Sequence, residues 1–195
     1  MSMFSLTRPT KAEIDAQFEA AASDTFSYPA VGATREPSPP AGFDIDHNRQ
    51  LLGRGPQAFE NAKRAIREWR MFEVPGLQLF HPDTPIEPGH TVGLVAGHLG
   101  FYSFNFCRIV YVIDEPDRFG FAYGTLRQHA ESGEERFTVE YHSDSDEVWY
   151  DIYAFSRPGN LLVRLGYPYA RYRQKSFAVG SKAAMLKAVR RSSAS

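Results

Sequence analysis

The chain has 195 residues, of which 43% are hydrophobic, and its formal net charge is −1 at pH 7. This composition is typical of a globular domain with a sizeable core, and the short, interrupted apolar runs exclude a transmembrane helix. The start lacks the apolar segment of a secretory signal, and the single cysteine, Cys107, excludes an internal disulfide, so we expect a cytoplasmic protein.

Two helices are predicted in the first half of the chain. Thr10 followed by Glu13 has the spacing of a capping box, which predicts a helix over 10–22. Residues 28–34 are compatible with a first strand, and a proline-rich stretch over 36–42 then ends regular structure. A second helix is predicted from Pro56 to about Phe72, because apolar side chains recur there at spacings of three and four.

The sequence of the second half of the chain predicts a sheet followed by a long helix. Short connections between successive strands favour antiparallel pairing. After a turn near Pro158, the spacing predicts a helix over 168–189. Six strands are predicted, at about 77–81, 91–98, 101–113, 118–126, 135–142 and 148–156.

This order of elements predicts an α+β fold of the helix-grip type. A curved antiparallel β-sheet would be closed by the long C-terminal helix, so that two layers share one core. The arrangement resembles START-type lipid-transfer domains and the birch-pollen allergen. We expect a single domain over 1–195, with an N-terminal helical extension over 1–25 and a helix-grip core over 26–190.

Several long motifs resemble a family of uncharacterised bacterial and plant proteins of unknown function. The motifs are Tyr-Gly-Thr-Leu over 123–126, His129 with Glu131, Gly-Glu-Glu over 133–135 and Ala-Phe-Ser-Arg-Pro over 154–158. The resemblance covers about 28–185. It implies that these residues form a feature shared by the family, and it implies no reaction.

The loop between two of the predicted strands carries candidate acid/base groups. His129 and Glu131 lie two residues apart, so in an extended loop they would face the same way. Glu134 is a third candidate. One hypothesis is therefore a cyclase-like or hydrolase-like enzyme in which His129 acts as the base and Glu131 or Glu134 assists. The alternative is a turn of solvated polar residues.

Arg108 is a charged residue in an otherwise apolar strand. By alternation it shares a face with Phe104, where an unpaired charge would be costly, so it needs a carboxylate, a ligand or water. A strand bulge that turns it outward is the alternative. We predict a charge network of Arg108, Arg157 and the carboxylates of Glu131, Glu134 or Glu135, which would either bind a ligand or lock the C-terminal helix.

The helix-grip fold also predicts an apolar pocket between the sheet and the C-terminal helix. Its occupant would be a small hydrophobic or amphipathic molecule, such as a lipid. The alternative is a solid core without a cavity. No cofactor is expected, and the spacing of His81, His90 and His98 matches no standard zinc site. The predicted lining is mainly aromatic: Phe104, Phe106, Tyr111, Tyr123, Tyr150, Tyr153 and Tyr169.

Charge is distributed unevenly along the chain. Residues 114–151 contain eleven acidic and three basic residues, whereas 152–195 contain nine basic residues and no acidic ones. The basic helix could lie near the acidic strands, or it could form a face for a phosphate-bearing ligand, a nucleic acid or an anionic membrane. The overall charge makes nucleic acid an unfavoured partner. The sequence predicts no oligomeric state.

Overall fold

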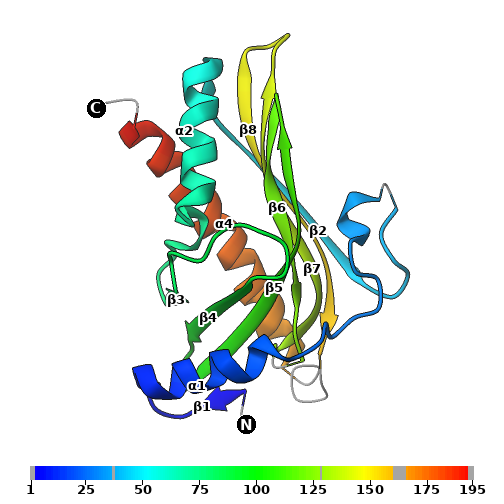
Figure 1. Cartoon of the computed structure of the whole chain (residues 1–195), viewed down its shortest axis with the longest axis vertical. Coiled ribbons are helices and arrows are strands. Elements are labelled where there is room, and N and C mark those ends of the chain that lie inside the picture. The colour runs from blue at the N-terminus through cyan, green and yellow to red at the C-terminus, as the bar shows by residue number, and fades with distance from the viewer. Residues whose placement is uncertain (1–2, 37, 128, 160–165, 193–195) are drawn as a thin grey trace.

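In the computed structural model, one antiparallel sheet curls around a long helix (Figure 1). The structure describes residues 3–36, 38–127, 129–159 and 166–192. The strands follow the order β2-β8-β7-β6-β5-β4-β3, and β1 pairs with β5. Their bounds are β1 Phe4–Ser5, β2 Asp44–Arg54, β3 Leu77–Phe80, β4 Thr91–Gly97, β5 Tyr102–Glu115, β6 Arg118–Thr125, β7 Glu131–His142 and β8 Glu147–Pro158.

Two helices cover the concave face of the sheet and a third lies on its convex face. α2 and α4 contact each other, and Figure 1 shows both on the same side of the sheet. α1 packs on the opposite face, where Ile14 joins a cluster with Phe104 and Phe106. The helical bounds are α1 Lys11–Ala22, η1 Ala33–Arg35, α2 Gly55–Arg67, η2 Arg70–Phe72 and α4 Tyr167–Ser192.

The main hydrophobic core lies between α2, the C-terminal half of α4 and the concave face. Alternation in a strand brings every second side chain to this face. Phe121, Phe137 and Tyr150 are fully buried there, together with Ile66 of α2 and Met185 of α4. The ring centroids of Phe121 and Phe137 are 5.4 Å apart. Large aromatic side chains therefore fill this end of the concave face.

The predicted helix-grip fold is confirmed by the curled antiparallel sheet and the long helix against its concave face. The predicted helices and six strands are present, with shifted ends. The capping box at the start of α1 is also confirmed, because Thr10 and Glu13 bond each other's backbone N–H groups. Among the described residues, no helix is long and apolar enough to cross a membrane.

Two predictions in the first half of the chain are corrected. Residues 28–34 are not a strand: they run across the convex face and lead into η1, because their polar groups bond Glu134 rather than a strand edge. Residues 44–54 were not predicted to be a strand, yet they form β2 at the edge of the sheet beside β8. The turn predicted after Pro158 falls mainly on 160–165, outside the described residues.

Candidate functional site

A cavity of about 1000 Å³ lies between the concave face and the N-terminal half of α4. Its wall contains apolar side chains from the sheet and from α4, including Leu94, Phe101 and Phe177. Polar groups are few by comparison and come from several different elements. The cavity is lined by Phe4 of β1 and by Tyr169 near the beginning of α4.

Small side chains leave this space open. At the other end, the concave positions carry Phe and Tyr, which fill the interior. At the cavity end, the corresponding positions of five neighbouring strands carry small residues, so α4 meets no bulky side chain across much of the gap. These positions are Ala96, Ser103, Thr125, Gly133, Ala154 and Ser156. This pattern of small residues at alternating positions is a signal of the cavity that the sequence contains and the sequence analysis missed.

A half-buried carboxyl group, that of Glu135, lies in the cavity wall. Tyr123 donates a hydrogen bond from its hydroxyl to Glu135 Oε2, at 2.9 Å. Burial, aided by the nearby carboxylates of Glu131 and Asp46 and opposed by the Tyr123 bond, raises the pKa of Glu135 to about 8. Glu135 therefore carries a proton at neutral pH and can donate a hydrogen bond.

Glu131 lies on the same face of β7 and also borders the cavity. Gln174 of α4 donates a hydrogen bond from Nε2 to the Glu131 carboxyl group, and its Nε2 lies 3.0 Å from Ser156 Oγ. Burial raises the pKa of Glu131, against the effect of the Gln174 bond. Gln174 thus connects α4 to two strands at the level of the carboxyl groups.

Two histidines border the same space and are neutral at neutral pH. The backbone N–H of Glu131 donates to His129 Nδ1 at 3.0 Å, and burial lowers the pKa of His129 to about 4. Burial likewise lowers the pKa of His98 to about 4, and the charge of Arg173 adds to that effect. The ring nitrogens of His98 lie 3.1 Å from Tyr169 Oη and 2.8 Å from Ser103 Oγ.

The three candidate acid/base residues therefore do not lie together, because the Glu134 side chain is on the opposite face of the sheet from His129 and Glu131. His129 and Glu131 both border the cavity, but the imidazole forms its hydrogen bonds with the backbone of Glu131 rather than with a carboxylate. The Glu134 carboxyl group lies on the convex face. It accepts hydrogen bonds from Tyr28 Oη and Gly32 N, both at 2.7 Å, and from Thr34 N at 2.9 Å.

Glycine at position 124 makes this convex arrangement possible. Gly124 pairs with Glu134 across β6 and β7. A Cβ atom at position 124 would lie only 2.0 Å from Tyr28 Oη, so a larger residue would exclude the tyrosine that reaches Glu134. The Tyr-Gly-Thr-Leu motif thus serves both faces, because Tyr123 points into the cavity while Gly124 makes room on the outside.

Arg108 lies on the convex face, and the prediction that it pairs with a carboxylate is wrong. It does share a face with Phe104, but α1 covers that face. The guanidinium donates to the carbonyl oxygens of Ala21, at 3.0 Å, and Asp24, at 2.8 Å. The negative end of a helix dipole attracts such a cation, so Arg108 satisfies the last turn of α1.

Several other predicted lining residues also lie away from the cavity. Tyr111 Oη is 2.7 Å from Thr34 Oγ1 on the convex face, and Arg157 stacks over the ring of Phe43. Tyr153 packs edge-on against His47. Tyr150 fills the core, with its hydroxyl 2.9 Å from Ser181 Oγ. Of the predicted set, the residues that border the cavity are Tyr123, Tyr169, His129, Glu131, Glu134 and Glu135, with the Glu134 carboxyl group turned outward.

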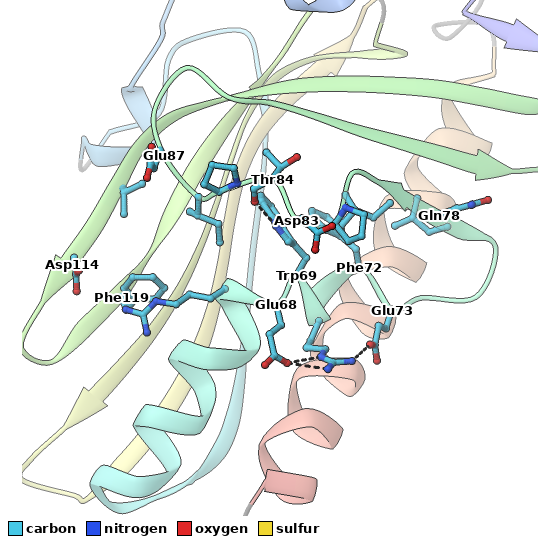
Figure 2. Close-up of a pocket in the computed structure, with 18 residues that line it drawn as sticks. Glu68, Trp69, Phe72, Glu73, Gln78, Asp83, Thr84, Glu87, Asp114 and Phe119 are labelled. Atoms are coloured by element: carbon cyan, nitrogen blue, oxygen red, sulfur yellow. Dashed lines mark hydrogen bonds and ion pairs between the residues drawn. The ribbon is translucent and has the colours of Figure 1, made fainter. Parts of the chain in front are cut away.

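A second hollow of about 980 Å³ lies between α2 with η2 and the loop 82–87 (Figure 2). Its lining mixes apolar and charged residues, and Trp69 donates from Nε1 to the carbonyl of Thr84 at 3.0 Å, which holds the loop in place. Figure 2 shows Glu68 and Glu73 on one side of the hollow, where Arg70 bonds both carboxylates. These charged groups bond one another at the rim of the hollow. Within the described part of the chain, no group of three or more His, Cys, Asp or Glu residues could hold a metal ion.

The curled sheet, the helix that it holds and the cavity between them define a helix-grip protein. A family model described as a domain of unknown function, DUF1990, matches residues 27–184, and the chain belongs to this family. A UPF0548 protein of Dictyostelium discoideum is 34% identical over 207 residues, covering 96% of each chain. A UPF0548 protein of Arabidopsis thaliana is 37% identical over 154 residues, covering 76% of this chain and 74% of the relative.

Solved structures with a similar outline are more distant. Ara h 8.0201 matches with a TM-score of 0.46 and 15% identity, over 76% of this chain and 98% of that chain. A norcoclaurine synthase point mutant from Thalictrum, solved with a transition-state analogue, matches with a TM-score of 0.46 and 8% identity, over 77% of this chain and 98% of that chain. At these identities the likeness concerns the fold alone, and no activity is transferred from either protein.

Proposed function

We propose that the protein binds a small amphipathic ligand in the cavity between the sheet and α4. The observation that carries this proposal is an open space of about 1000 Å³ at one end of an otherwise filled interior. Ligand sites are typically apolar cavities with a few converging polar groups, and this cavity has that composition. The apolar part of the ligand would lie against Leu94, Phe101 and Phe177.

The carboxyl groups restrict the polar end of the ligand. Glu135 holds its proton at neutral pH, so it can donate to a carbonyl, hydroxyl or ether oxygen without burying an unpaired charge. A ligand carboxylate or phosphate placed beside Glu131 and Glu135 would meet like charge as soon as either group ionised. We therefore expect the buried polar end of the ligand to be uncharged.

A titration with Nile red, a neutral lipophilic dye, tests this proposal. The expected result is saturable fluorescence enhancement that is lost in Ala154→Phe, because the new ring would occupy the cavity. Ala183→Phe is the matched control, since Ala183 is exposed on α4 and should bind dye as the wild type does. Melting curves check that each variant is folded, and Ala96→Phe offers a second way to fill the cavity. Unchanged dye binding in both folded cavity-filling variants would overturn the proposal.

A second candidate function is acid–base catalysis centred on Glu135 rather than on a pair of His129 and Glu134. A carboxyl group with a pKa of about 8 is a suitable general acid at neutral pH, and it borders a cavity. The test is to incubate wild type and Glu135→Gln with a small-molecule extract and compare the products by mass spectrometry. A product made by the wild type alone supports catalysis, whereas identical profiles count against it.

A further inference from the structure

Two highly exposed leucines lie at the end of the sheet that borders the cavity. Leu99 is 92% exposed in the turn between β4 and β5, and Leu6 is 85% exposed directly after β1. β1 pairs with β5 so that Ser5 lies opposite Tyr102, which brings Leu6 beside this turn. Leu6 and Gly100 both line the cavity opening. Neighbouring exposed leucines at an apolar opening indicate a surface that meets an apolar partner.

The beginning of α4 adds cations and an aromatic ring at the same end of the molecule. Figure 1 shows β1 and the orange first half of α4 at this end, and the contact of Tyr169 with His98 joins α4 to the β4–β5 turn. Tyr172 is 65% exposed. Arg173 and Lys175 border the cavity and form no ion pair with the described residues, whereas Arg171 is paired with Asp46. Residues 166–192 include no acidic residue.

We propose that this surface docks on an anionic lipid membrane and presents the cavity mouth to the bilayer. This surface, the mouth rim, consists of Leu6, Leu99, Tyr172, Arg173 and Lys175. The inference rests on the proposed ligand binding, because docking would let an apolar ligand pass between bilayer and cavity without crossing water. Docking of the mouth rim on a membrane does not itself depend on a ligand in the cavity.

The combination of residues favours a bilayer over other partners. Exposed leucines can insert into the acyl region, a tyrosine is suited to the interface, and Lys or Arg can contact lipid phosphates. A nucleic acid would use the cations but would offer nothing to Leu6 and Leu99. A protein partner would use the leucines but would not require an anionic lipid, so the vesicle experiment distinguishes these partners.

Co-sedimentation with large unilamellar vesicles tests the proposal. The full chain is mixed with phosphatidylcholine vesicles that contain roughly one part in three phosphatidylserine, or with phosphatidylcholine alone. We expect binding to the anionic vesicles that weakens as salt is raised, because the attraction between the rim cations and the lipid phosphates is screened. Leu99→Asp and Leu6→Asp should each reduce binding roughly tenfold or more, since each removes an inserting leucine and adds a negative charge.

Val31→Asp is the matched control. Val31 is 44% exposed on the segment that crosses the convex face, so the same change there should leave vesicle binding unaltered. Failure of the wild type to sediment with anionic vesicles would overturn the proposal. So would unchanged binding in both folded leucine variants, or an equal loss in Val31→Asp.

Nile red binding separates this proposal from the one on which it rests. Leu99→Asp should lose vesicle binding and keep dye binding in solution, because the leucine is outside the cavity wall. If the wild type binds vesicles but no dye, the mouth rim stands and the cavity proposal fails. If the wild type binds dye but no vesicles, the membrane proposal alone fails.

Discussion

Glu134 and Glu135 are neighbours on β7, yet their carboxyl groups lie on opposite faces of the sheet. Outside, Glu134 is surrounded by donors from the segment 28–34, which fix that segment to the sheet. Inside, Glu135 has Tyr123 as its hydrogen-bond donor and faces open space. The convex face thus supplies several donors to the Glu134 carboxyl group, whereas Tyr123 supplies one to Glu135 in the cavity wall. The comparison teaches that the Gly-Glu-Glu motif serves two places, because Glu134 fixes the segment 28–34 while Glu135 borders the cavity.

The largest expected effect is on the convex side. Glu134→Ala removes an acceptor from Tyr28, Gly32 and Thr34 together and leaves buried donors without partners, so it should lower the free energy of unfolding by about 3 kcal/mol. Urea denaturation measures this loss. Nile red binding by the folded fraction should be unchanged. A loss below about 0.5 kcal/mol would show that the segment 28–34 does not depend on Glu134.

The next effect is a pH dependence that arises on the concave side. Because the pKa of Glu135 is about 8 in the folded chain and near the ordinary glutamate value of 4.5 when unfolded, the folded state binds the extra proton between these values. Stability from this group is therefore lost as pH rises from about 4.5 to 8. His129 and His98, with folded pKa values of about 4 against 6.5, act in the opposite direction as pH falls below 6.5.

The window from pH 6.5 to 8 consequently isolates Glu135 from these two histidines. Across this window the wild type should lose up to about 2 kcal/mol relative to Glu135→Gln, in which the titrating group is absent. Urea denaturation at several pH values gives the difference between the two chains. Parallel pH profiles for wild type and variant would mean that Glu135 is already ionised at neutral pH, contrary to the proposed uncharged cavity.

Arg108 should matter for stability and not for the cavity. Arg108→Met removes the donor that satisfies carbonyls at the end of α1, which should cost about 1.5 kcal/mol. Arg157→Met is the matched control on the same face, because Arg157 is exposed and stacks on Phe43, and it should change stability by less than about 0.5 kcal/mol. Reduced Nile red binding by a fully folded Arg108→Met variant would contradict the position of Arg108 on the convex face.

Strand alternation explains both what the sequence predicts at Arg108 and what it leaves open. Alternation places Arg108 and Phe104 on one face, as in the structure. It divides the side chains between two faces but does not indicate which face α4 covers. The sequence predicts the helix α1 but not its position, and α1 covers the convex face with its own apolar side chains. A charged residue beside aromatics was therefore assigned to the wrong layer.

The missed strand β2 has a different cause. Its sequence is mostly polar and lacks the apolar alternation that marks a half-buried strand. The strand forms because its side chains find partners far away in sequence: Asp46 bonds Arg171 of α4, and His47 contacts Asp151 of β8. Such pairings depend on the completed fold, so local sequence could not reveal them. The long helix and the central strands were predictable because their own apolar spacing determines them.

The smallest effect tests the link between Tyr123 and Glu135. Tyr123→Phe keeps the ring but removes the hydroxyl that donates to Glu135, so stability should fall by about 1 kcal/mol at most. The hydrogen bond favours the ionised carboxylate, and its removal should raise the pKa of Glu135 above its present value. The pH-dependent loss of stability would then extend to higher pH than in the wild type. A shift to lower pH would mean that Tyr123 stabilises the protonated acid instead, and that the cavity presents a carboxylate rather than a hydrogen-bond donor to its ligand.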